Sequence, residues 1–170
     1  EGFGYMDMTI HNGIRNSTKE SYLKEPLENL NILTNTHVRK ILTEKNGSDI
    51  KAIGVEYYQN GKIHQLYTDS EVILSAGAIN SPQLLLLSGI GINNSNIPII
   101  IDNPEVGQNL QDHLELYVQI GCKENNTLLN WATWNKPHKR IKAGLDWFIN
   151  KKGICASNHF EVGGFIRSRA

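Results

Sequence analysis

Apolar and polar residues alternate from Leu30 to Leu74 in the way typical of β-strands. Three runs show this alternation: LNILTNTHVRKILTE, IKAIGVEYYQ and KIHQLYTDSEVILS. Asn60 and Gly61 separate the second run from the third, and Asn-Gly is typical of the two-residue turn of a β-hairpin. The pattern therefore predicts a small antiparallel sheet in this segment.

The alternation gives way to a continuous apolar run at its end. Residues 71–75 read EVILS, and such a run is typical of a strand covered on both faces. Gly77 follows and gives the backbone a freedom that other residues lack. Ser81 and Pro82 then predict a helix start, and Gly89 predicts its end. Strand, glycine turn and helix would gather free backbone N–H groups at one point, as phosphate sites do, although many ordinary strand-helix junctions look the same.

Two further helices are predicted outside this region. Ser17 and Thr18, with Glu20, form a capping pattern for a short helix that ends near Pro26. The stretch IKAGLDWFINKKG predicts a second helix at residues 141–153.

Composition excludes several classes of protein. The 170 residues include 17 basic and 17 acidic residues, so no charge excess favours binding to nucleic acid. No apolar run approaches the roughly 18 to 20 residues that span a bilayer, and the first residues do not resemble a signal peptide. Cys122 and Cys155 have no CxxC partner, and the histidines lack metal-ligand spacing. We expect an ordinary globular chain without a metal site.

Several longer motifs resemble one enzyme family. SAGAINSPQLLLLSGIG resembles the second signature of the glucose-methanol-choline (GMC) family of flavin-dependent alcohol oxidoreductases, and VGQNLQDH resembles its next marker. SNHFEVGGFIRSR is similar to the choline-oxidising branch. The resemblance implies an α/β fold: residues 1–113 would be the middle of a Rossmann-like FAD-binding domain, and residues 114–170 the start of a sheet-and-helix substrate domain.

The same resemblance assigns roles to four residues. Val38 would lie beside the adenine of FAD, and Ala76 and Gly77 would form a turn close to the cofactor. Glu161 would face the trimethylammonium group of choline, the expected small-molecule substrate. Without the resemblance, Val38 reads as a core valine and Glu161 as a surface glutamate on a strand.

The chain also departs from the family pattern. It has no GxGxxG fingerprint, and the family's catalytic histidine would lie beyond Ala170, so no catalytic residue is assigned. We therefore expect an internal fragment of a longer enzyme, inactive alone. A GMC enzyme for another alcohol and a truncated, non-catalytic product stay open as alternatives.

Some assignments stay open at this stage. Arg15 either positions a loop near the cofactor or pairs with a carboxylate. Three tryptophans, which are Trp131, Trp134 and Trp147, either line a cage for a quaternary ammonium or pack in a core or an interface. The electron acceptor is not indicated. For the parent enzyme we expect a bacterial cytoplasmic or inner-membrane-associated location, with a mitochondrial location as the alternative.

Overall fold

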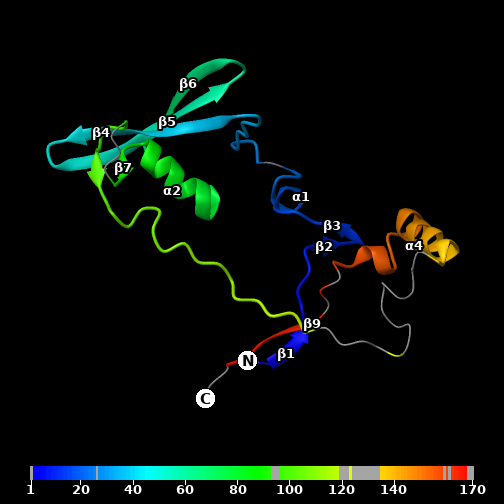
Figure 1. Ribbon diagram of the computed structural model, residues 1–170. Coiled ribbons are helices and arrows are strands. Elements are labelled where there is room, and N and C mark those ends of the chain that lie inside the picture. Colours follow the sequence, from blue (N-terminus) through cyan, green and yellow to red (C-terminus); the bar gives the residue numbers. More distant parts are fainter. Residues whose placement is uncertain are drawn as a thin grey trace. The chain divides into compact units, whose positions relative to one another are not determined.

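The computed structural model describes residues 2–25, 27–92, 96–118, 123, 135–158, 160 and 162–167. The chain divides into two compact units (Figure 1). Unit 1 combines Glu1–Leu30 with Tyr117–Ala170, and unit 2 is Asn31–Leu116.

Unit 2 is built on a three-stranded antiparallel sheet. Its strands are β4 (His37–Asn46), β5 (Asp49–Gln59) and β6 (Lys62–Tyr67), in the order β4-β5-β6. Asn60 and Gly61 have φ of 51° and 81°, as a tight hairpin turn between β5 and β6 requires. The predicted antiparallel sheet and its Asn-Gly turn are confirmed.

The helix that follows the sheet begins earlier than predicted. Helix α2 spans Gly77–Leu87 and contains Pro82 in its interior. The Ser81 hydroxyl accepts a hydrogen bond from the backbone N–H of Ala76, which precedes the helix, at 3.1 Å. The prediction of a start at Ser81 is therefore wrong, because the helix begins at Gly77 and the Ser81 hydroxyl bonds to an amide that precedes it in the chain.

The predicted buried strand at residues 71–75 is also absent. These residues have no regular secondary structure, and Ile73 is 83% exposed. A strand needs a neighbour to share its backbone hydrogen bonds. The described residues place no strand beside this run, and its Val72 and Leu74 are half-buried while Ile73 is exposed.

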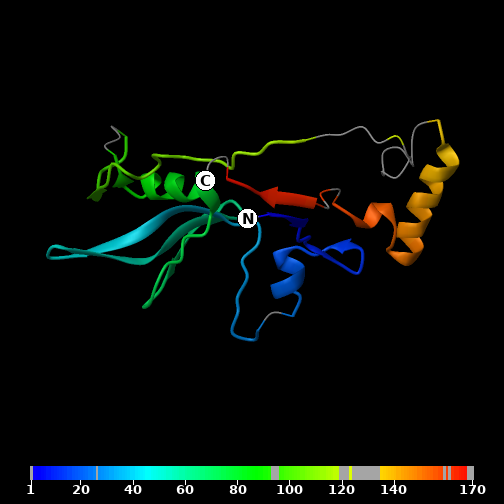
Figure 2. The same ribbon diagram turned by 90° about the horizontal axis from the view of Figure 1, so that it is seen from below.

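Buried residues follow the end of α2: Ser88, Gly89 and Gly91. The helix ends at Leu87 with Ser88 as its C-cap. Gly89 follows with φ of +77°, which confirms the predicted glycine stop. Two short strands follow, β7 (Ile90–Gly91) and β8 (Ile101–Asp102), which pair in parallel. Figure 2 shows α2 lying along the sheet.

Unit 1 joins segments from both ends of the sequence. Strand β1 (Gly2–Tyr5) pairs antiparallel with β9 (Val162–Phe165), and β2 (Ile10–His11) pairs with β3 (Ile14–Arg15). Helix α4 (Pro137–Asn150) is followed by the 3₁₀ helix η1 (Ile154–Ala156).

The two helices predicted in this part of the sequence are present. Helix α1 (Thr18–Tyr22) has Ser17 as its N-cap, and the Ser17 hydroxyl accepts the backbone N–H of Glu20 at 3.4 Å. Helix α4 includes most of the predicted stretch 141–153.

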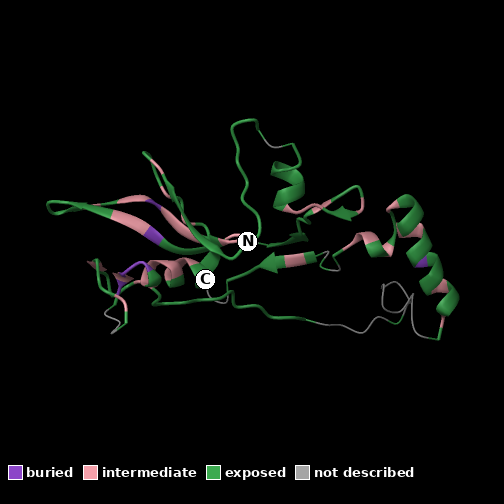
Figure 3. Cartoon of the chain, turned by 90° about the horizontal axis from the view of Figure 1, so that it is seen from above, coloured by how far each residue is buried: buried purple, intermediate pink, exposed green. Residues whose placement is uncertain are grey.

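Few of the described side chains are buried (Figure 3). Ile41 and Ala143 are the buried hydrophobic residues among them, and Ser88 is the buried polar one. Large apolar side chains such as Leu114 and Phe165 are exposed. In the described part of the chain, no helix is both long enough and apolar enough to cross a membrane.

Candidate functional site

The turn that begins α2 leaves its backbone open on one side. Gly77 has φ of +88°, a conformation that side chains with a Cβ rarely adopt. A Cβ built on Gly77 would meet nothing within 4 Å. Gly77 therefore contacts no packed neighbour on this side, and a ligand can approach the glycine backbone directly. Ala76, the N-cap of α2, is exposed beside it.

Val38 lies on the surface of unit 2 near the start of β4. It pairs with Tyr57 of β5, and the register of the two strands shifts between Val38 and Lys40. Its exposed fraction is 37%. A register shift of this kind twists the strand and redirects its side chains.

Ser88 fixes the position of α2 against β4. Its hydroxyl accepts the backbone N–H of Ile41 at 2.8 Å and donates to the carbonyl oxygen of Leu84 at 2.6 Å. Figure 1 shows β4 and α2 running in the same direction, with β7 beyond the C-terminal end of the helix. The starts of β4 and α2, which carry Val38 and Gly77, therefore lie toward the same end of unit 2. No hydrogen bond among the described residues joins Val38 to Gly77.

Glu161, the expected substrate residue, lies outside the described residues. Trp131 and Trp134 also lie outside them. In the sequence, Glu161 is preceded by Phe160 and followed by strand β9. The ring centroid of Phe160 is 6.1 Å from that of Tyr117.

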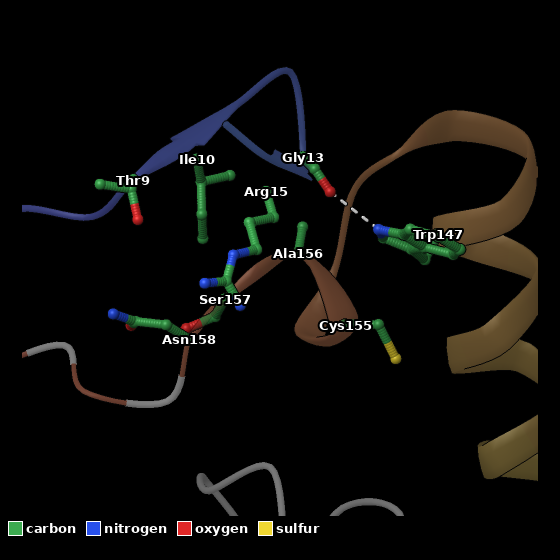
Figure 4. Close-up of a pocket in the computed structure, with 9 residues that line it drawn as sticks. All are labelled: Thr9, Ile10, Gly13, Arg15, Trp147, Cys155, Ala156, Ser157 and Asn158. Atoms are coloured by element: carbon green, nitrogen blue, oxygen red, sulfur yellow. Dashed lines mark hydrogen bonds between the residues drawn. The ribbon is translucent and has the colours of Figure 1, made fainter. Parts of the chain in front are cut away.

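Unit 1 contains a groove that the sequence analysis did not predict (Figure 4). Its volume is about 500 Å³. The β2–β3 hairpin contributes one wall, and α4 with the segment around η1 contributes the other. The lining residues are Thr9, Ile10, Gly13, Arg15, Trp147, Cys155, Ala156, Ser157 and Asn158.

A hydrogen bond holds the two walls of this groove together. The indole N–H of Trp147 donates to the carbonyl oxygen of Gly13 at 2.8 Å. Asn12 and Gly13 have φ of 50° and 71°, so the same Asn-Gly turn that joins β5 to β6 forms here. The Asn-Gly dipeptide is the sequence signal that indicates this hairpin. The strands beside it have two residues each and show no alternation of apolar and polar residues.

The groove contains Arg15 and Trp147, whose roles the sequence left open. The Lys151 ammonium lies 4.2 Å from the centroid of the Trp147 ring. This contact and the bond to Gly13 favour a packing role for Trp147 over a cage for a foreign ammonium. Arg15 forms no ion pair with any carboxylate in the described part of the chain.

Comparisons with known proteins identify the class of this chain. The family model described as GMC oxidoreductase matches residues 1–115. The chain belongs to the GMC oxidoreductase family, as its motifs predicted.

Particular relatives resemble nearly the whole chain. It is 47% identical to the mitochondrial choline dehydrogenase of Mus musculus, over 99% of this chain and 28% of that protein. It is 45% identical to an oxygen-dependent choline dehydrogenase of Burkholderia ambifaria, over 99% of this chain and 30% of that protein. The chain thus spans less than a third of the length of these relatives.

A solved structure has a similar fold. An FAD-dependent oxidoreductase from Chaetomium thermophilum, in complex with a small-molecule fragment, matches with a TM-score of 0.72 and 26% sequence identity. The match covers 95% of this chain and 29% of that one. This agrees with the predicted α/β class.

Proposed function

We propose that this chain is part of an FAD-dependent alcohol oxidoreductase that oxidises choline to betaine aldehyde. The observation that carries the proposal is the identity of 45–47% to choline dehydrogenases over 99% of the chain. The proposal concerns the longer protein, because the chain spans 28–30% of the length of those relatives.

The geometry of unit 2 supports a place for part of the cofactor. Gly77 presents an uncovered backbone in a conformation that needs glycine, and Ala76 lies exposed beside it. Val38 is exposed near the start of β4. These residues fit a ligand that contacts backbone edges and an apolar surface, as the adenine half of a dinucleotide does. We propose that Val38, Ala76 and Gly77 contact FAD. When bound, FAD accepts the hydride from the carbinol carbon of the substrate.

Recognition of choline requires a different kind of group. Its trimethylammonium carries a permanent charge and has no N–H to donate, so a carboxylate must act on it as a point charge with apolar surface around the methyl groups. We propose that Glu161 is this carboxylate. Coulomb attraction at about 4 Å is worth about 1 kcal/mol in water and several times more in a shielded pocket.

The same proposal assigns the two parts of the chain to different domains of the enzyme. Residues 1–113 would belong to the FAD-binding domain and residues 114–170 to the start of the substrate domain. We propose that the remainder of the enzyme covers the apolar side chains that the described residues leave exposed, Ile73 and Leu114 among them.

The experiment that tests this function uses the full-length protein that contains the chain. The purified flavoprotein is incubated with choline and an artificial electron acceptor, and the product is identified by mass spectrometry. Formation of betaine aldehyde supports the proposal. Oxidation of other alcohols without oxidation of choline would favour a GMC enzyme with a different substrate, and a protein that holds no flavin would favour a non-catalytic product.

A further inference from the structure

The groove of unit 1 has an uneven distribution of charge. Among the described residues that line it, Arg15 is the charged one, and none is a carboxylate. Thr9, Ser157 and Asn158 add hydroxyl and amide groups. A guanidinium among neutral hydrogen-bonding groups, as these described residues provide, favours a negatively charged ligand.

The side chains are oriented for such a ligand. Figure 4 shows the Arg15 side chain pointing toward Ser157 and Asn158. The side-chain oxygen of Asn158 accepts the backbone N–H of Phe160 at 3.1 Å, which leaves the NH₂ group of Asn158 as a donor. Arg15 has no ion-pair partner within the described ranges.

The walls of the groove are held in place before any ligand arrives. Arg15 lies on β3, directly after the Asn12–Gly13 turn, and the bond from Trp147 to Gly13 ties this turn to α4. A Cβ on Gly13 would overlap with the carbonyl oxygen of Lys151, so the turn packs closely against the end of α4. A preorganised site loses less free energy to ordering when it binds.

We propose that this groove binds an oxyanion, a carboxylate or a phosphate group, through the guanidinium of Arg15 with Ser157 and Asn158 beside it. The guanidinium fork matches the two oxygens of such a group. The proposal rests on Arg15, Ser157 and Asn158 and does not depend on the identity of the alcohol. The oxyanion has two conceivable sources, a free anion in solution and a phosphate of the bound cofactor.

The test measures binding of inorganic phosphate and of acetate to the full-length protein by isothermal titration calorimetry at constant ionic strength. Three proteins are compared: wild type, Arg15→Gln and Arg39→Gln. Arg39 is the matched control, because it pairs with Glu56 at 2.9 Å on the sheet of unit 2 and does not line the groove. We expect wild type and Arg39→Gln to bind alike. Arg15→Gln should bind more weakly by about tenfold or more, as expected when a charge-assisted hydrogen bond is lost.

Holoprotein and flavin-free protein distinguish the two sources. Binding to both forms, with normal flavin content in Arg15→Gln, supports a free anion. Binding to the flavin-free form alone, with lower flavin content in Arg15→Gln, supports a cofactor phosphate. The proposal is overturned if wild type binds neither probe in either form, or if Arg15→Gln binds as wild type does.

A second variant covers the case in which Arg15→Gln does not fold. Thr9 is exposed at the edge of the groove, so its replacement disturbs little packing. Thr9→Glu places a carboxylate near Arg15 and should abolish binding of both probes without removing the arginine. Unchanged binding in folded Thr9→Glu protein would contradict the proposal.

Discussion

The indole nitrogen of Trp147 lies 2.8 Å from the carbonyl oxygen of Gly13 and donates a hydrogen bond to it across 134 residues of sequence. Among the described residues, this bond and the β1–β9 ladder both connect the first and last segments of unit 1. The Arg15 groove lies beside this bond, and both Gly13 and Trp147 line it.

Replacing Gly13 by alanine should separate the β2–β3 turn from α4, because the added methyl group overlaps with the carbonyl of Lys151. Gly47→Ala is the matched control: Gly47 also has positive φ, +63°, but a Cβ there meets nothing within 4 Å. Gly47→Ala should lower the free energy of unfolding by about 1–2 kcal/mol, from backbone strain alone. Amide hydrogen exchange of the full-length protein measures this effect. In Gly13→Ala, exchange should become faster in residues 10–15 and 147–151. Equal protection of these residues in both variants would contradict the packing described.

Replacing Ser88 by alanine should loosen α2 from β4. The variant leaves the buried backbone N–H of Ile41 without its acceptor, which costs about 1–3 kcal/mol. Ser48→Ala, in an exposed turn, is the control. Amide exchange in the peptide that covers residues 37–46 should become faster in Ser88→Ala and stay unchanged in Ser48→Ala. Slow exchange in both would mean that the bond contributes little.

Replacing Gly77 by valine should lower the flavin content of the full-length protein more than Ala78→Val does. A β-branched residue does not tolerate φ of +88°, and its side chain would fill the open space that we assign to the cofactor. The ratio of flavin to protein absorbance in the purified variants measures the effect. Normal flavin content in Gly77→Val would remove this turn from the cofactor site.

Local signals predicted part of the fold well. The hairpin between β5 and β6 follows from Asn60 and Gly61 because long alternating strands flank them. The same dipeptide at Asn12 and Gly13 was missed, because that hairpin is held by Trp147, far away in the sequence. Patterns report local preference, whereas a contact of this kind depends on tertiary packing.

The wrong predictions have a related cause. An apolar run such as 71–75 indicates a strand only if a neighbour pairs with it, and the described residues supply none. Ser81 and Pro82 carry a capping signal, but the helix had already begun at Gly77. The family resemblance predicted a cofactor turn at Gly77, which stays a prediction. The Arg15 groove, by contrast, is formed by residues from both ends of the chain and has no continuous motif.

Removing the charge of Glu161 should separate choline from a neutral analogue. In the full-length enzyme, Glu161→Gln should raise the KM for choline by about tenfold or more, since the pocket loses the counter-charge of the ammonium. The KM for 3,3-dimethylbutanol, which has the same shape without the charge, should change little. Equal effects on both alcohols would exclude Glu161 as the residue that recognises the charge.

The central claim is that the enzyme containing this chain oxidises choline with its flavin, and anaerobic reduction of the wild-type flavin tests it most directly. The full-length protein is mixed without oxygen with choline or with 3,3-dimethylbutanol, and the visible absorbance band of the flavin is followed. We predict that choline bleaches the band, and does so at lower concentration than the neutral analogue. An oxidised flavin that choline leaves unchanged, in protein that another alcohol reduces, would contradict the account.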